Sequence, residues 1–168
     1  RQFLMLEATA LSYMISSSQH DSDFLMKIVD ELSQNKYPHD IEGGFLRAER
    51  HAKKVLSVVK SIEDSIVLSK NLAYVQINSE LPSSMVVNFV LGASGKPVAL
   101  VYKTKEDIKS CIISIRGSNE CKVHLGRIVN NLSSALSGSG GGHEKACGAV
   151  IPKDKFLEFI KQLDKKSR

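Results

Sequence analysis

Residues 137–149 contain the residue types in this sequence best suited to binding an anion. Five of the eleven glycines lie between positions 138 and 148, three of them in succession at Gly140, Gly141 and Gly142. Consecutive glycines reach backbone conformations that other residues rarely adopt. Their N–H groups can then point into one concavity and hold an anion such as a phosphate. His143 follows directly and can donate a hydrogen bond to the same anion, so the pattern predicts a phosphate-binding loop.

A flexible linker is the alternative interpretation of this segment, since residues 137–142 contain only serine and glycine. Against a plain linker, a histidine and the small side chains of residues 146–149 follow at once, and such a strand lets a ligand approach closely. The segment is not a P-loop, because no Lys-Ser or Lys-Thr follows at the required spacing. It is not a dinucleotide fingerprint either, because the predicted order is helix, glycines, strand.

A second candidate contact is Arg116-Gly117-Ser118, at the end of a predicted strand. An arginine there can make a bidentate contact with phosphate. Gly117 leaves room for the ligand, and Ser118 adds a hydroxyl that can also cap the turn into the next helix. A surface arginine before a turn would look the same, so the triplet alone does not establish a site.

The elements that position these residues follow from the spacing of apolar side chains. Helical spacing predicts that the first sixty residues are helical apart from a loop at 35–44. Short β-rich runs then alternate with helical segments, which indicates one sheet with helices packed on it. Strands are expected at 65–69, 72–77, 98–102, 109–115 and 146–151, and helices at 82–92, 120–136 and from Pro152 onward. The predicted fold class is α/β, with a mixed β-sheet and flanking helices preceded by an all-helical N-terminal segment.

The composition is that of an ordinary globular protein, with 42% hydrophobic and 24% charged residues among 168. No apolar run approaches the roughly 20 residues that span a bilayer, so neither a transmembrane protein nor a membrane partner is expected. The sequence has no initiator Met and opens on the partly apolar run Arg1–Leu6. We therefore expect the chain to be part of a longer protein.

The net charge of +5 is unevenly distributed along the chain. Residues 1–60 carry eight basic and eight acidic side chains, whereas residues 61–168 carry fifteen basic and ten acidic ones. A basic excess in one part suits an anionic partner such as nucleic acid or a nucleotide, although a solvated surface with surplus lysines has the same charge.

The three cysteines are Cys111, Cys121 and Cys147, an odd number with no CxxC pair. Neither a disulfide framework nor a structural zinc site is therefore supported. Free thiols indicate a reducing compartment, which predicts a cytoplasmic protein. Cys147 lies among small residues with no base beside it in the sequence, so we interpret it as a buried hydrophobic residue rather than a nucleophile.

The run Gly140–His143 followed by residues 146–149 resembles the glycine–histidine signature of the DHH-associated domain, the C-terminal half of DHH-superfamily phosphoesterases. The Arg116–Ser118 turn and the helical His124-Leu125-Gly126-Arg127 are most similar to the RecJ-like branch of single-strand-specific exonucleases. The resemblance covers about residues 65–165. We interpret His124 and Arg127 themselves as a solvated helix edge.

The resemblance implies specific contacts. Arg116 and His143 would contact substrate phosphates, Gly140–Gly142 would line the pocket, and Ser118 would assist. The partner would be single-stranded nucleic acid or a short oligonucleotide. In this family, an N-terminal domain with an Asp-His-His motif binds two divalent metals, usually manganese, or magnesium, that activate the hydrolytic water.

No Asp-His-His triplet occurs in this sequence. His20-Asp21 and His39-Asp40 have the reverse order, and we interpret them as loop residues near helix caps. We therefore expect no catalytic residue, no metal and no cofactor in this chain. Residues 1–62 are expected to be the tail of a catalytic domain plus linking helices, and residues 63–168 the DHH-associated substrate-binding domain.

Two alternatives remain open at this point. Some RecJ-related proteins are inactive scaffolds of replication and repair complexes, in which case this chain would be an interaction module. The other alternative is a phosphodiesterase of the same superfamily that acts on oligonucleotides or cyclic dinucleotides. By itself, the chain is expected to bind phosphates and to hydrolyse nothing.

Overall fold

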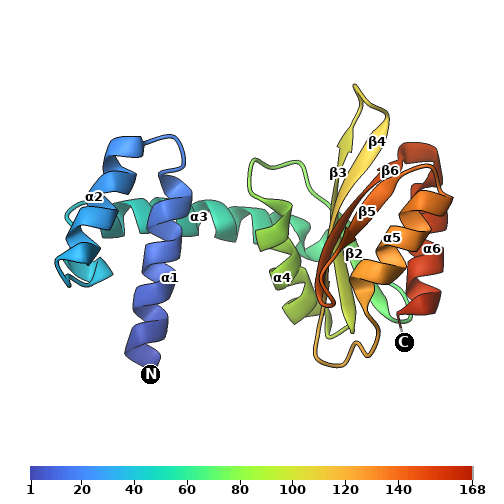
Figure 1. Ribbon diagram of the computed structural model, residues 1–168, viewed down its shortest axis with the longest axis horizontal. Coiled ribbons are helices and arrows are strands. Elements are labelled where there is room, and N and C mark those ends of the chain that lie inside the picture. Colours follow the sequence, from blue (N-terminus) through green and yellow to red (C-terminus); the bar gives the residue numbers. More distant parts are fainter. Residues whose placement is uncertain (168) are drawn as a thin grey trace. The chain divides into compact units, whose positions relative to one another are not determined.

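The computed structural model describes residues 1–167, which form two compact units, each with its own hydrophobic core. Figure 1 shows the helices and strands of both units. One unit comprises Arg1–Val58, and the other begins at Val59, within helix α3 (Gly44–Ile62). Among the described residues, no helix combines the length and the apolar character needed to cross a membrane.

The N-terminal unit is helical, as predicted. It contains α1 (Gln2–Ser17), α2 (Ser22–Ser33), the 3-10 turn η1 (Pro38–Asp40) and the part of α3 up to Val58. Asp21 caps α2 by accepting a hydrogen bond from the Phe24 amide at 3.1 Å, and its carboxylate pairs with Arg47 at 2.7 Å. Both contacts lower the pKa of Asp21, the Phe24 amide most. The guanidinium carbon of Arg47 also lies 3.9 Å from the centre of the Phe24 ring. Arg47 therefore links α3 to the start of α2.

His39 and Asp40, predicted as loop residues, lie in η1. The His39 amide donates to Glu7 Oε2 at 3.1 Å, and its ring Nδ1 lies 2.5 Å from Glu7 Oε1. Glu7 is buried on α1, so this pair of contacts satisfies its carboxylate and ties η1 to α1. The role of His39 visible here is structural.

The second unit is built on a six-stranded mixed sheet in the order β1-β2-β3-β4-β6-β5. Among the described strands, only β2 and β3 are parallel, and helix α4 (Ser83–Ser94) connects them; the other neighbours are antiparallel. This arrangement confirms the predicted α/β class with a mixed sheet. The strands are β1 (Val67–Leu68), β2 (Leu72–Gln76), β3 (Val98–Lys105), β4 (Ser110–Gly117), β5 (Ser139–Gly142) and β6 (Ala146–Pro152).

The sheet carries α4 on one face and α5 (Leu125–Ala135) with α6 (Phe156–Lys166) on the other (Figure 1). Alternate strand residues face each layer because side chains alternate along a strand. The larger core lies under α5 and α6. Its fully buried members include Leu100, Ile115, Leu125, Ile151 and Phe159. Two further 3-10 turns, η2 (Glu63–Ser65) and η3 (Lys153–Lys155), precede β1 and α6.

Several element boundaries differ from the prediction, and strand β3, for example, runs to Lys105 rather than ending at residue 102. Helix α5 begins at Leu125 rather than Glu120, because residues 118–124 form a turn. Helix α4 continues past Gly92 to Ser94, and Gly95 ends it in the left-handed conformation at φ 61°. The serine–glycine run is a strand, β5, where the sequence suggested a loop or a linker.

Gly126 on α5 marks the closest approach of this helix to β5. A Cβ at this position would lie 2.0 Å from the Gly142 carbonyl oxygen, a backbone atom that cannot move alone. The substitution Gly126→Ala should therefore lower the free energy of unfolding by about 1–3 kcal/mol, as measured by urea denaturation. Gly92→Ala on α4 is the matched control, since nothing lies within 4 Å of its Cβ. It should stabilise the protein by up to about 1 kcal/mol. If both variants were equally stable, α5 would not approach β5 this closely.

Candidate functional site: the β5–β6 hairpin and its neighbours

Three consecutive carbonyls of the β5–β6 turn point away from solvent, toward α5 and β4. The amides that donate to them are Gly126 to His143 at 3.1 Å, Leu125 to Glu144 at 3.0 Å and Gly117 to Lys145 at 2.9 Å. Two of these donors are first-turn amides of α5, which have no partner within their own helix. The hairpin therefore caps the helix, and the helix fixes the hairpin.

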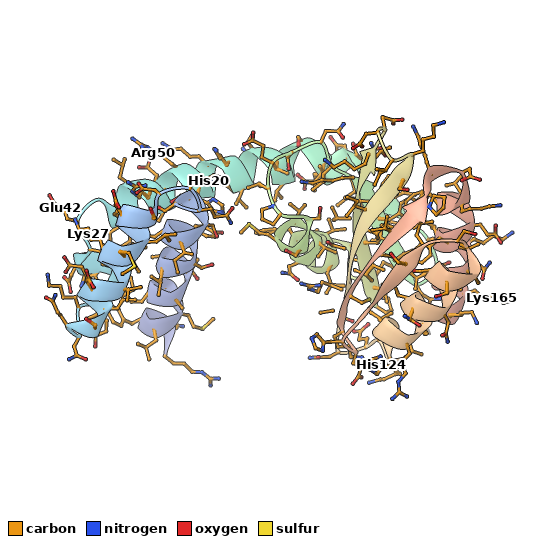
Figure 2. The ribbon with its side chains drawn as sticks, turned by 45° about the horizontal axis from the view of Figure 1, so that its top comes forward. His20, Lys27, Glu42, Arg50, His124 and Lys165 are labelled. Atoms are coloured by element: carbon orange, nitrogen blue, oxygen red, sulfur yellow. The ribbon has the colours of Figure 1, made fainter. Side chains whose placement is uncertain are left out.

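The hydrogen bonds between the β5–β6 turn and α5 also explain why this helix begins at Leu125. His124 is its N-cap residue, and its ring Nδ1 accepts a hydrogen bond from the Arg127 amide at 3.3 Å. Lys145 Nζ donates to the carbonyl of Cys121 in the preceding turn. Figure 2 shows His124 beside the N-terminal end of α5. His124 is thus a half-buried capping residue, a role that its interpretation as a solvated helix edge did not include.

The glycine run forms the outer edge of the sheet. Gly141 and Gly142 have φ angles of 145° and 138°, which favour glycine. In an antiparallel ladder, residues that face the neighbouring strand alternate with residues that face outward. Because the His143 amide donates to the Ala146 carbonyl at 2.8 Å, the backbone of Gly141 faces β6. The backbones of Gly140 and Gly142 therefore face outward, so the three amides alternate in direction rather than converging on one point.

Arg116 lies near the end of β4, opposite Ala146 on β6. Since His143 is hydrogen-bonded to Ala146, the three residues occupy one row across β4, β6 and the end of β5. At the usual strand spacing of about 4.8 Å, the backbones of Arg116 and His143 are about 10 Å apart. Only the methyl group of Ala146 stands between them in this row. The structure thus brings these two predicted site residues to one region of the sheet.

The Arg116 side chain is half-buried and lies on the sheet face opposite the larger core, because its neighbour Ile115 belongs to that core. Its Nη1 donates to the Ile115 carbonyl at 3.1 Å. Within residues 1–167, the guanidinium has no carboxylate partner. Most of its hydrogen-bonding capacity is therefore available to an anion.

Ser118 is occupied by the turn after β4. Its hydroxyl accepts a hydrogen bond from the Glu120 amide at 3.2 Å, and its own amide donates to the Pro97 carbonyl at 2.8 Å. A hydroxyl oxygen that accepts one such bond can still donate its proton. Ser118 shapes the end of the strand that carries Arg116, as its predicted turn-capping role requires.

Cys147 lies in the row next to Arg116, on the buried face of β6. Burial raises the pKa of its thiol to about 12, and the Arg116 charge opposes this rise only in part. Burial also raises the pKa of Cys111. A thiol so seldom ionised is a poor nucleophile, in agreement with the interpretation of Cys147 as a small hydrophobic residue.

A pocket of about 380 Å³ lies between α5 and the outer edge of β5. Its lining residues are Gly126, Arg127, Asn130, Asn131, Gly141 and Gly142. Sequence reasoning missed the two asparagines and treated Arg127 as a plain solvated residue. The available signal was helical spacing, since positions 126 and 130, and 127 and 131, are four residues apart and share a helix face. It was missed because β5 was not predicted as a strand.

No group of three or more His, Cys, Asp or Glu side chains within residues 1–167 is placed to hold a metal ion. The described residues therefore do not fit a divalent-metal site of the DHH type, and no chemical step at a metal is assigned to them.

Comparison with known proteins identifies the sheet domain. The DHHA1 domain family matches residues 69–167. The uncharacterized protein MJ0831 of Methanocaldococcus jannaschii is 41% identical over 75 residues, which are 41% of this chain and 16% of that protein. The chain thus spans only a small part of this relative.

Two solved structures show the same fold. The pGpG-specific phosphodiesterase PggH of Vibrio cholerae superposes with a TM-score of 0.68 at 12% identity, covering 94% of this chain and 56% of that one. RecJ of Thermus thermophilus, solved with Mg²⁺, superposes with a TM-score of 0.54 at 11% identity, covering 76% of this chain and 21% of RecJ. At such low identities, the similarity establishes the fold alone.

The raised thiol pKa predicts low reactivity of Cys147. Because the folded state favours the protonated thiol, Cys147 makes its full contribution to the free energy of unfolding at pH values below about 8.5, the pKa of the thiol in the unfolded chain. This contribution is lost as the pH rises through the folded pKa of about 12. We expect iodoacetamide at pH 9 to alkylate Cys147 in urea but not in the folded protein, as read by peptide mass spectrometry. Equal labelling in both states would contradict its burial.

Proposed function

The chain belongs to the DHHA1 domain family, and on that premise we propose that residues 63–168 hold the phosphates of a nucleic-acid substrate for a RecJ-like phosphodiesterase. The substrate is a single-stranded nucleic acid or a short oligonucleotide. Residues 1–62 belong to the tail of the catalytic domain and its linking helices, and a catalytic domain outside this chain binds Mn²⁺ or Mg²⁺. We propose the cytoplasm as the compartment, since all three cysteines are free and buried.

The observation that carries this proposal is the row of Arg116, Ala146 and His143. A guanidinium without a carboxylate partner in the described chain and an exposed imidazole flank a residue that has only a methyl group. Both flanking groups can donate hydrogen bonds to phosphate oxygens, and the small residue between them leaves room for the ligand. This combination favours a phosphate over an uncharged ligand.

The backbone around His143 supports the same conclusion. The three turn carbonyls are occupied by α5 and β4, whereas the amides of Glu144 and Lys145 donate no backbone hydrogen bond within the described chain. A turn whose acceptors are engaged and whose donors remain available is better suited to an anion than to a cation. The excess of basic residues after position 60 adds a long-range attraction of the same sign.

A specific observation favours a second candidate, the interaction module. Several large apolar side chains at the start of α1 are exposed, with Leu4 at 61%, Met5 at 65% and Leu6 at 72%. Contiguous exposed apolar side chains of this kind mark surfaces that bind other proteins. In a scaffold of a replication or repair complex, this helix would contact another subunit, and the phosphate site would be unnecessary.

Arg116→Ala and His143→Ala should each weaken binding of a fluorescent single-stranded oligothymidylate by about tenfold or more in fluorescence anisotropy. The reason is that a hydrogen bond to a charged group contributes about 1.5–3 kcal/mol. Lys165→Ala, which removes an exposed charge from α6 (Figure 2), is the control and should bind as the unmodified chain does. Unchanged binding by both test variants would contradict the proposed phosphate site. In the parent enzyme, the same two substitutions should reduce turnover on single-stranded substrate.

The chain itself should hydrolyse nothing. With Mn²⁺ present and a labelled oligonucleotide as substrate, we expect no release of nucleotides on a sequencing gel, because no metal-ligand cluster exists within residues 1–167. Adding the catalytic domain should be necessary for cleavage. Release of nucleotides by the pure chain would contradict the assignment of catalysis to another domain.

A further inference from the structure

The pocket beside β5 contains more hydrogen-bond donors than the fold uses. Within residues 1–167, the side chains of Arg127 and Asn131 make no hydrogen bond or ion pair. Both are exposed on α5 and line the pocket. Asn130, by contrast, is engaged, since its Nδ2 donates to the Gly140 carbonyl at 3.0 Å. The two free side chains offer a planar guanidinium and an amide to a ligand.

The backbone adds a donor from the opposite wall of the pocket. The Gly142 backbone faces outward from β6, toward the side on which α5 lies. The absence of a Cβ at Gly126 allows the helix to come this close, because any side chain there would collide with the Gly142 carbonyl. The pocket therefore has a helix wall that carries side-chain donors and a strand wall that carries an amide.

The charge of the pocket selects the class of ligand. Among the described residues, no acidic side chain lines it. The carboxylate of Glu144, in the adjoining turn, lies 3.4 Å from the Lys145 ammonium. A cationic group and neutral donors without a counter-ion suit an anion, and the planar guanidinium matches the oxygens of a phosphate.

We propose that this pocket binds a second phosphate group, next to the one held by Arg116 and His143. The inference rests on the proposed function and extends its site across the edge of the sheet. From β4 outward, the order is Arg116, Ala146, His143 and then the pocket beside Gly142. His143 thus lies between two groups of phosphate donors. Arg116 lies on the α4 face of the sheet and the pocket lies on the α5 side, so a chain of linked phosphates meets both by passing around the outer edge of β5 at His143, whether it is a nucleic-acid strand or an inorganic polyphosphate.

The test compares two substitutions in the 168-residue chain, Arg127→Gln and Asn131→Asp, by anisotropy of the fluorescent oligothymidylate over a series of NaCl concentrations. Arg127→Gln should weaken binding about five- to tenfold and reduce the magnitude of the salt slope by about 0.7, the value for one phosphate contact on a single strand. Asn131→Asp, which adds a negative charge without changing size, should weaken binding at least as much. Both residues are exposed, so both variants should retain the thermal unfolding transition of the unmodified chain.

Matched controls separate the pocket from general charge effects. Lys165→Gln removes an exposed positive charge from α6, and Asn88→Asp makes the same amide-to-acid change on the exposed side of α4. Both should leave binding within about twofold of the unmodified chain. Competition by inorganic tripolyphosphate identifies the source of the phosphate. Displacement by tripolyphosphate alone indicates a polyphosphate, and preferential displacement by unlabelled oligonucleotide indicates a nucleic-acid strand; either result supports the shared chemistry.

The outcomes distinguish the two proposals. If Arg116→Ala weakens binding but the Arg127 and Asn131 variants bind normally, the second phosphate site is refuted and the proposed function stands. If none of the substitutions affects binding, both are refuted. If Arg127→Gln changes the preference among bases without changing the salt slope, the pocket contacts a base and the phosphate assignment is wrong.

Discussion

The sheet domain depends on the hydrogen bonds through which the β5–β6 turn and the first turn of α5 satisfy each other. A helix leaves its first amides without partners, and a tight turn leaves carbonyls without partners. Here the carbonyls of His143 and Glu144 accept from the amides of Gly126 and Leu125. These two hydrogen bonds satisfy the first amides of α5 and the carbonyls of the turn, and they fix the distance between the helix and the hairpin. The same hydrogen bonds occupy the turn carbonyls, whereas the amides of Glu144 and Lys145 donate no backbone hydrogen bond within the described chain.

The glycines have a different role from the one that the sequence suggested. Their succession suggested either an anion-binding loop with converging amides or a flexible linker, whereas the structure has a short edge strand with alternating amides. Gly126, which stands alone in a helix, proves as important as the run itself because it permits the contact with Gly142. A glycine in a helix interior is unfavourable by about 1 kcal/mol relative to alanine, which packing must offset. Close packing rather than flexibility therefore explains most of the glycines in this region.

Much of the architecture could be predicted because it is encoded locally. The apolar spacing of α3 and α6 and the β-rich runs of β2 and β3 are visible within short windows, and the mixed α/β class followed from their order. The strand β5 could not be found in this way, because glycine and serine have low strand propensity and pair here only through the partner β6. The early start predicted for α5 has a similar cause, since the true beginning is set by carbonyls nearly twenty residues later in the chain.

Strand β5 has one further consequence, for self-association. An edge strand without bulky or charged side chains invites pairing with the edge of another molecule, and β5 consists only of serine and glycine. Helix α5 lies along this edge, and Asn130 occupies the outward carbonyl of Gly140, so an incoming strand has little backbone with which to pair. The opposite edge, β1, is only two residues long. The contact between α5 and β5 that shapes the pocket thus also protects the sheet from edge-to-edge aggregation, and any change that loosens α5 would affect both the pocket and the edge.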